Sequence, residues 1–158
     1  MKHLLLVFGL TLAACTNAQE YVTQTDAQTA LHPNETPQIR RLIMKYAKIH
    51  DIPEALLHAV IQRESDYRPH VRNGPYYGMM QILPQTARSM GFSGAPSELL
   101  MTENNLIYAG RYLRGAWIVS EGNIDTAVEW YARGYYYEAR DRCLLVKTKL
   151  NSREIRHC

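Results

Sequence analysis

Apolar residues recur at helical spacing along most of the chain after residue 35. Thr36 is a suitable N-cap, and Pro37 suits the first position of a helix. A stripe at i, i+3 and i+4 spacing follows, formed by Ile39, Leu42, Ile43, Tyr46 and Ala47. The pattern predicts an amphipathic helix that begins at Pro37.

A second helix is predicted to follow directly. Asp51 and Glu54 are three residues apart, as in a capping pair at a helix N-terminus. Pro69 disfavours helical geometry at Arg68, so this helix should end near Tyr67. The segment 71–78 contains Asn-Gly-Pro and a further glycine, which predicts a loop.

Three more helices complete the pattern. A short one is expected over 84–90, ended by Gly91, and a long one over 103–119. Asp125 is predicted to cap the third, which carries Ala127, Val128 and Tyr131. The stripe of the long helix consists of Leu106, Ala109, Gly110, Leu113, Ala116 and Trp117. Since no segment shows sustained strand alternation or an internal repeat, the predicted fold class is all-α.

The first fourteen residues have the pattern of a secretory signal peptide. Lys2 precedes an apolar run, and 4–14 is too short for a transmembrane helix, which needs about 20 residues. The string Leu-Ala-Ala-Cys ending at Cys15 resembles the cleavage box of bacterial lipoproteins, in which the cysteine is acylated. Thr16 in place of aspartate resembles the outer-membrane signal, which predicts a lipid anchor on the periplasmic face of that membrane. A soluble signal peptide followed by an incidental cysteine is the alternative.

The composition fits one domain with a short appendage. The chain has 158 residues, of which 46% are hydrophobic and 21% charged, and its net charge is +3. Residues 16–132 contain 10 basic and 12 acidic side chains, whereas 133–158 contain 7 and 3, so the basic excess lies at the C-terminal end. With so small a net charge and no readout motif, nucleic acid is not an expected partner.

The cysteines are few and have separate expected uses. With Cys15 acylated, Cys143 and Cys158 remain in an oxidising compartment and are predicted to form a disulfide. Closing a loop of about 15 residues contributes on the order of 3 kcal/mol in the chain-entropy treatment. No Cys or His pair has the spacing of a zinc site, so neither a metal nor a cofactor is predicted.

Glu64 is a carboxylate on the apolar face of the second predicted helix. At 100° per residue, with Leu57 at 0°, Ile61 lies at about 40° and Glu64 at about −20°. Burial at that position would raise the pKa of Glu64, as a general acid requires. The alternatives are an ion pair with Arg68 or a side chain that reaches solvent. Asp66 lies about 160° away around the helix and cannot share the site.

Four groups of residues resemble, in order, the motifs of the SLT-type lytic transglycosylases. They are Glu64-Ser65, Gly78-Met79-Met80-Gln81-Ile82 followed by Pro84 and Thr86, Asn105-Leu106 with Gly110 and Tyr112-Leu113, and Tyr131 with Gly134. The resemblance covers roughly residues 37–134. It implies a lysozyme-like helical domain, as in goose-type lysozyme, with a groove for peptidoglycan glycan strands. It also implies cleavage of the β-1,4 bond between N-acetylmuramic acid and N-acetylglucosamine, leaving a 1,6-anhydromuramic end.

The resemblance also suggests a role for each matching residue. Glu64 takes the place of the single acid and base, because the substrate's own C6 hydroxyl replaces water as the nucleophile. Other substrate-binding positions implied by the motifs are Ser65, Gly78, Met80, Gln81, Asn105 and Tyr131. Gly78 would let the backbone approach the sugar, and Asn105 would either cap its helix or contact substrate. Tyr131 would hydrogen-bond near Glu64 or serve as a core aromatic residue.

The sequence departs from the family pattern at two places. Met79 replaces the usual leucine, and Ala132-Arg133 replaces the usual Asn-Ala. Ala132 cannot make the hydrogen bonds of an amide. A catalytically idle glycan-binding scaffold is therefore one alternative to the transglycosylase. The other is a hydrolytic muramidase on the same scaffold, with Glu129 or Asp125 orienting water. The expected organisation is a signal peptide at 1–14, a tether at 15–35, a catalytic domain at 36–134 and a basic, disulfide-tied extension at 135–158.

Overall fold

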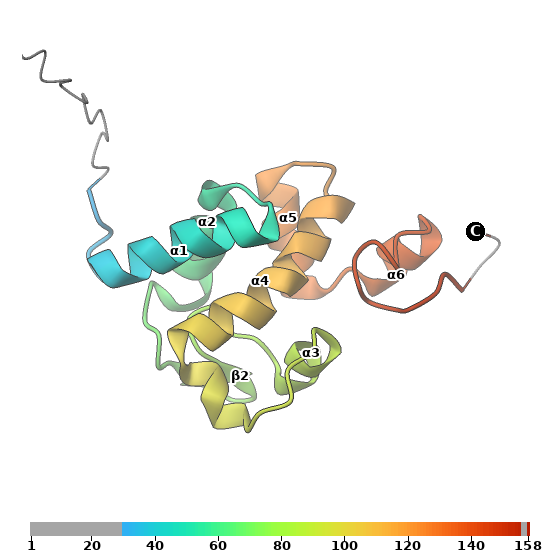
Figure 1. Cartoon of the computed structure of the whole chain (residues 1–158). Helices are drawn as coiled ribbons and strands as arrows, with labels where there is room; N and C mark the ends of the chain where they lie inside the picture. Colours follow the sequence, from blue (N-terminus) through green and yellow to red (C-terminus); the bar gives the residue numbers. More distant parts are fainter. Residues whose placement is uncertain (1–29, 156–157) are drawn as a thin grey trace, which may run out of the picture.

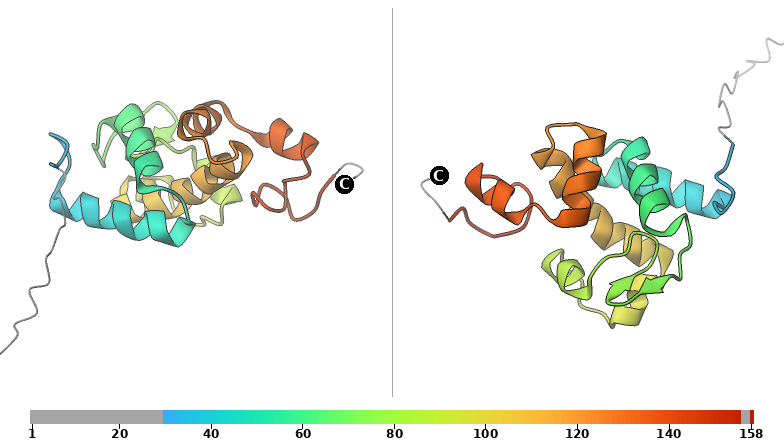
Figure 2. Two further views of the ribbon diagram at one scale, coloured as in Figure 1. Left: turned by 90° about the horizontal axis from the view of Figure 1, so that it is seen from above. Right: turned by 180° about the vertical axis from the view of Figure 1, so that it is seen from behind.

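The long helix predicted over 103–119 forms the centre of the fold. The structure is a computed structural model that describes residues 30–155 and 158. Its helices are α1 (Pro37–His50), α2 (Glu54–Ser65), α3 (Pro84–Ser89), α4 (Thr102–Val119), α5 (Ile124–Arg133) and α6 (Tyr136–Asp141), with the 3-10 helix η1 (Pro96–Leu100) before α4. Helices α1 and α5 pack on α4, and α2 packs on α1 and α5 (Figures 1 and 2). The predicted all-α class is confirmed, since the described chain is mainly helical.

The N-cap of α1 agrees with the sequence prediction, whereas the N-caps of α2 and α5 differ from it. Thr36 caps α1 as predicted, because its hydroxyl accepts the Ile39 N–H at 3.1 Å. Asp51 instead ends α1 in the left-handed conformation, and α2 begins after Pro53. Helix α5 is capped by Asn123, whose side chain accepts the Thr126 N–H at 2.9 Å. The predicted cap, Asp125, lies within the first turn, where the helix dipole still stabilises a carboxylate.

The predicted loop after α2 contains a very short hairpin. Strand β1 (Arg72–Asn73) pairs antiparallel with β2 (Tyr76–Tyr77), and Arg72 lies opposite Tyr77. Two-residue strands cannot show the alternation by which longer strands are recognised, so the sequence predicted only a loop. The hairpin lies on the side of the fold opposite α6 and the C-terminus (Figure 2).

The region after residue 134 belongs to the same core as the helices before it. Tyr135, Ala139 and Leu145 are buried in that core. Tyr135 also donates a hydrogen bond from its hydroxyl to Tyr112 O at 2.7 Å. Helix α6 was not predicted, because six residues are too few to show helical periodicity. The extension predicted over 135–158 therefore contributes side chains to the core of the helical domain.

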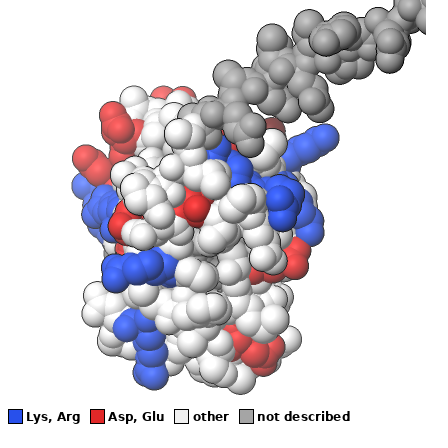
Figure 3. All heavy atoms as spheres, turned by 90° about the vertical axis from the view of Figure 1, so that its left-hand side faces the viewer, with Lys and Arg blue, Asp and Glu red and all other residues white. Residues whose placement is uncertain are grey.

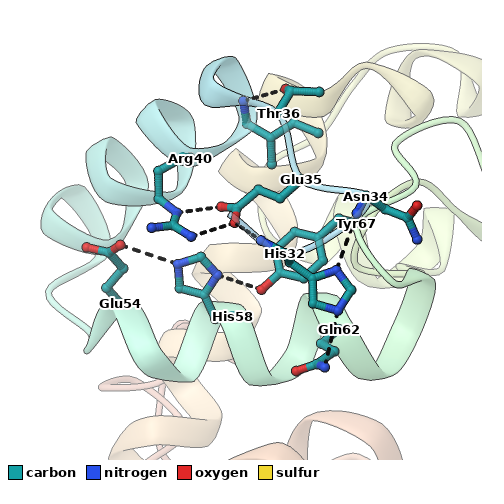
Figure 4. A network of polar contacts seen from close by, with 10 residues as sticks. His32, Asn34, Glu35, Thr36, Arg40, Glu54, His58, Gln62 and Tyr67 are labelled. Carbon is teal, nitrogen blue, oxygen red and sulfur yellow. Dashed lines mark hydrogen bonds and ion pairs between the residues drawn. The ribbon is translucent and has the colours of Figure 1, made fainter. Parts of the chain in front are cut away.

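The residues before α1 pack against the C-terminal end of α2 (Figure 4). We call His32, Asn34 and Glu35 the N-terminal clasp. The His32 ring stacks on Tyr67 with 4.7 Å between centroids, and Asn34 Nδ2 donates to Asp66 at 2.7 Å. The tether predicted to extend to residue 35 therefore ends earlier, because the clasp is already part of the folded domain.

The clasp is continuous with a polar network beneath it. The buried carboxylate of Glu35 accepts two hydrogen bonds from the Arg40 guanidinium at 2.6 and 2.5 Å. His58 Nδ1 lies 2.7 Å from the Tyr67 hydroxyl, and His58 Nε2 lies 3.3 Å from Glu54 (Figure 4). The bidentate pair of Glu35 and Arg40 has well-defined geometry, so it fixes the residue before the cap of α1 to the first turns of that helix.

The predicted disulfide between Cys143 and Cys158 is present, with 5.7 Å between the Cα atoms. We expect its loss to lower the free energy of unfolding by about 3 kcal/mol, because the open chain gains entropy in the unfolded state. Thermal and urea unfolding of the wild type and of a Cys143→Ser, Cys158→Ser double variant would measure this. A reductant should destabilise the wild type and leave the double variant unchanged. Equal stability of the two proteins would contradict the prediction.

The predicted signal peptide, Cys15 and most of the predicted tether lie outside the described residues. Among residues 30–155, no helix is long and apolar enough to cross a membrane. Figure 3 shows basic and acidic side chains interspersed on one face of the domain.

Candidate active site

Glu64 lies one residue before the end of α2 and lines an open cavity. The neighbouring apolar positions Leu57, Val60 and Ile61 are fully buried, as the helical arithmetic predicted. The Glu64 side chain itself remains 22% exposed. Burial raises the pKa of the Glu64 carboxyl above its ordinary value, and the positive charge of Arg63 opposes this in part. The side chain therefore has the properties of a general acid with access to a ligand.

The proposed ion pair between Glu64 and Arg68 is absent. Arg68 Nε instead donates to Ser65 O at 2.8 Å, across the end of α2. The cation near Glu64 is Arg63, whose Nε lies 3.7 Å from Glu64 Oε1. This distance is longer than a hydrogen bond, so the carboxyl is not locked in a strong ion pair.

The cavity has a volume of about 500 Å³ and is formed mainly by α2, the segment 73–86 and α5. Its lining residues are Arg63, Glu64, Asn73, Tyr76, Gln81, Ile82, Leu83, Thr86, Tyr112, Tyr131, Ala132, Arg133 and Gly134. Three of the predicted site residues, Glu64, Gln81 and Tyr131, are among them. Polar and aromatic side chains of this kind suit a sugar chain, which presents both hydroxyls and apolar ring faces.

A second cavity of about 550 Å³ lies between α1, α4 and residues 147–149. It contains none of the predicted site residues and no carboxylate in its lining. The cavity at Glu64 is therefore the one that combines an acid with a binding surface.

Asn105 is part of the wall that supports the cavity and does not line it. Its side chain is fully buried, and its Oδ1 accepts the Met80 N–H at 2.7 Å. Its Nδ2 donates to Tyr77 O and to Leu99 O, both at 2.9 Å. The expectation that Asn105 caps its helix or contacts substrate is therefore corrected: Asn105 joins α4 to the segment that carries Met80 and Gln81.

Gly78 is required by this same contact. Its φ is +74°, and a Cβ at that position would overlap Asn105 and Leu99 O. A side chain is thus excluded both by the left-handed backbone and by the close packing. Gly78 does not line the cavity, so the close approach that it allows is to Asn105, and the predicted approach to the sugar is corrected.

Ser65 and Met80 also lie behind the cavity wall. Ser65 is buried, and its hydroxyl donates to Ile61 O within α2 at 3.4 Å. The Met80 side chain is fully buried in the core. Both were predicted to bind substrate. Met80 supports the site through its backbone, because its carbonyl accepts a hydrogen bond from Tyr131.

Gln81 shapes the loop on which it lies. Its φ is +48°, and its Nε2 donates to Gly78 O at 2.7 Å and to Val71 O at 3.1 Å. These bonds tie Gln81 to both ends of the hairpin, since Val71 precedes β1 and Gly78 follows β2. The Gln81 side chain is mostly buried yet still lines the cavity, as predicted.

Tyr131 combines the two roles that the sequence left open. It packs in the core, and its hydroxyl donates to Met80 O at 2.8 Å. Burial raises the pKa of Tyr131 well above its ordinary value, and the negative charge of Glu64 adds to this effect. Tyr112 packs edge-on against Tyr131, and burial raises the pKa of Tyr112 to about 12. Both phenols therefore stay neutral and serve as hydrogen-bonding and packing groups.

Glu64 is the only carboxylate that lines the cavity in the part of the chain that the structure describes. Asp125 and Glu129, the two candidates for a second carboxylate, both lie on α5 but do not reach the lining. Over the same residues, no group of three His, Cys, Asp or Glu side chains could hold a metal ion. Acid catalysis by one carboxyl group is thus the chemistry that this arrangement supports.

Several lining residues were not predicted, among them Asn73, Tyr76 and Leu83. They come from the hairpin and the segment that follows it, and their spacing in the sequence does not indicate that they line the same cavity as residues of α5. Thr86, Tyr112 and Gly134 had been noted only as parts of motifs. The sequence did draw attention to Arg133, because a charged residue at that position departs from the family pattern.

Comparison with known families gives one match. A family model described as transglycosylase SLT domain matches residues 41–141. The matched region contains every residue that lines the Glu64 cavity. No solved structure matches the chain.

Proposed function

The chain belongs to the transglycosylase SLT domain family, and from this membership we propose that it is a murein lytic transglycosylase with Glu64 as its single catalytic acid and base. Family membership indicates transglycosylase activity on peptidoglycan. The proposed reaction is cleavage of the β-1,4 bond between N-acetylmuramic acid and N-acetylglucosamine with formation of a 1,6-anhydro end. The presence of one carboxylate in the cavity lining is the observation that carries this proposal.

The reaction can be written with one protein carboxyl group. Protonated Glu64 gives its proton to the glycosidic oxygen as the bond from C1 to that oxygen breaks, and the N-acetyl group of the substrate assists at C1. The resulting carboxylate then takes the proton of the C6 hydroxyl, whose oxygen bonds to C1. Glu64 is protonated again at the end, and no water is consumed. The raised pKa of Glu64 favours its starting form.

The hydrolytic alternative needs a group that orients water. Glycosidases that use water usually have a second carboxylate, either as the base that activates water or as the nucleophile, and none of the described residues supplies one to the cavity. The idle-scaffold alternative rests on the absence of asparagine at Ala132. Ala132 lines the cavity, but the raised pKa of Glu64 and its access to the cavity do not depend on it.

Product analysis tests the proposal directly. Purified sacculi would be digested with the unmutated protein, and the soluble muropeptides would be analysed by mass spectrometry. We expect anhydromuramic ends, which lack one water relative to reducing ends. Reducing ends without anhydro ends would show a hydrolytic muramidase, and intact sacculi would favour the scaffold.

The pKa of Glu64 should be visible in the pH dependence of cleavage. Because a general acid must be protonated and burial raises its pKa, we expect kcat/KM to fall only above the pH at which an ordinary glutamate ionises. Arg63 lowers the pKa of Glu64, so Arg63→Gln should move this alkaline limb to higher pH. Initial rates between pH 4 and pH 9 would measure it. If the alkaline limb of kcat/KM did not move in Arg63→Gln, or moved to lower pH, the assignment of Glu64 as the general acid would be contradicted.

We further propose that the protein is exported and held at the periplasmic face of the outer membrane by acylation of Cys15. The lipoprotein-like string before Cys15 supports this. Radiolabelled fatty acid should be incorporated into the wild type and not into a Cys15→Ser variant. Equal labelling of both proteins would rule out the anchor.

A further inference from the structure

Arg133 lies at the cavity that contains Glu64, at the position where the sequence departs from the family pattern. The cavity lining has three charged side chains, which are Arg63, Glu64 and Arg133, and the other lining residues are neutral. When Glu64 is protonated, as the proposed reaction requires at its start, the charged groups of the lining are both positive. Such a surface attracts an anionic group on the ligand.

The Arg133 guanidinium is held in place by a ring contact and not by an ion pair. It lies over the ring of Trp130, one turn earlier on α5, with 4.0 Å from its central carbon to the ring centroid. Among the described residues, no carboxylate is within ion-pair distance of Arg133, although Glu129 is four residues before it on the same helix. Stacking covers a face of the guanidinium, while hydrogen bonds are made in its plane, so the planar fork of N–H groups can still bind a carboxylate.

We propose that Arg133 binds a carboxylate of the glycan substrate and so makes the enzyme selective for acidic over neutral strands. This inference rests on the proposed action on peptidoglycan. Muramic acid offers two sources of a carboxylate near the cleaved bond. One is the stem peptide, and the other is the lactyl group, which is free where the peptide has been removed.

The experiment compares native sacculi with sacculi whose carboxylates have been converted to neutral carboxamides by carbodiimide and ammonia. We expect the wild type to cleave the amidated sacculi about tenfold less efficiently, which corresponds to one charge-assisted contact. Arg133→Ala should cleave native sacculi about as slowly and show little response to amidation. Arg133→Lys, which keeps the charge but lacks the planar fork, should be intermediate. A merely structural Arg133 would lower both rates equally and leave their ratio unchanged.

Arg88→Ala is the matched control. Arg88 is an exposed arginine in the last turn of α3, as Arg133 is in the last turn of α5, and it does not line the cavity. It should keep the wild-type response to amidation. Raising the salt concentration should reduce the selectivity of the wild type and of Arg88→Ala, because an exposed charge contact is screened.

Binding separates this inference from the proposed reaction. Cosedimentation with sacculi in the Glu64→Gln background needs no turnover, and the Glu64→Gln protein should prefer native over amidated sacculi. The Glu64→Gln, Arg133→Ala double variant should show no preference. Strands freed of stem peptides by an amidase are soluble and carry the free lactyl carboxylate, so their binding would be measured by calorimetry. A preference for these strands over their amidated form would show that Arg133 binds the lactyl carboxylate, and no preference would assign the stem peptide. Equal binding of native and amidated sacculi by Glu64→Gln would overturn the inference, even if anhydro products are formed.

Discussion

Replacing Glu64 with glutamine is expected to lower kcat for cleavage of sacculi by about a thousandfold. Glutamine has nearly the same shape but cannot give a proton to the glycosidic oxygen. No other carboxylate of the described chain lines the cavity, so no neighbouring group can take over the role. Release of soluble muropeptides over time, compared at equal enzyme concentration, would measure the loss.

The Glu64→Gln substitution should slow the chemical step without lowering the stability of the fold. Because the folded state raises the pKa of Glu64, ionisation of this carboxyl opposes folding at pH values above its ordinary pKa. Glu64→Gln should therefore be at least as stable as the wild type at neutral pH in thermal unfolding. Glu129→Gln, at an exposed glutamate of α5 outside the lining, is the matched control and should keep wild-type activity. Comparable losses in the two variants would refute the assignment of Glu64.

Replacing Asn105 with alanine is expected to lower the free energy of unfolding by about 4 kcal/mol. The change removes three hydrogen bonds at once and leaves the Met80 N–H and Leu99 O without the Asn105 side chain, while Tyr77 O keeps its hydrogen bond from the Ile82 N–H. The loss is a large share of the 5–15 kcal/mol that stabilises a typical domain. Urea unfolding followed by circular dichroism would measure it.

Asn104→Ala gives the comparison for this variant. Asn104 is the preceding residue on α4, and its side chain donates a hydrogen bond to Glu98 O and a weaker one to Met101 Sδ, both at exposed positions. Its loss should cost less than about 1 kcal/mol. If Asn105→Ala were no more damaging than Asn104→Ala, the role of Asn105 as the link between α4 and the Met80 segment would be wrong. Activity should fall with stability in Asn105→Ala, because that segment carries Gln81 into the cavity.

The helices and the catalytic carboxyl could be predicted because both depend on local periodicity. The stripe of α1 fixed its buried face, and the same 100° arithmetic placed Glu64 among Leu57 and Ile61. Helix α6 is too short to show a period. The cap of α5 was misplaced by two residues, because Asp and Asn near a helix start can serve either as cap or within the first turn. Asp51 was misassigned because an aspartate between two helices can also end the first of them in the left-handed conformation.

The supporting residues of the site could not be predicted in the same way. Asn105 contacts Met80, which is 25 positions earlier in the chain, and Tyr131 contacts Met80 across 51 positions. The motifs marked these residues as important, but a motif does not distinguish a residue that contacts substrate from one that supports the wall of the cavity. That distinction depends on burial and on hydrogen-bond partners, which only the folded chain provides.

The N-terminal clasp affects which fragment of the protein could be transferred to another polypeptide as a catalytic domain. A fragment cut at the family match, 41–141, would lack the Thr36 cap, the buried pair of Glu35 with Arg40, and both ends of the disulfide. Fused into another polypeptide, such a fragment would carry Glu64 on a helix whose end no longer has the contacts of the clasp. A chimera that keeps the protein from His32 through Cys158 would retain those contacts, so a fusion should be joined before His32.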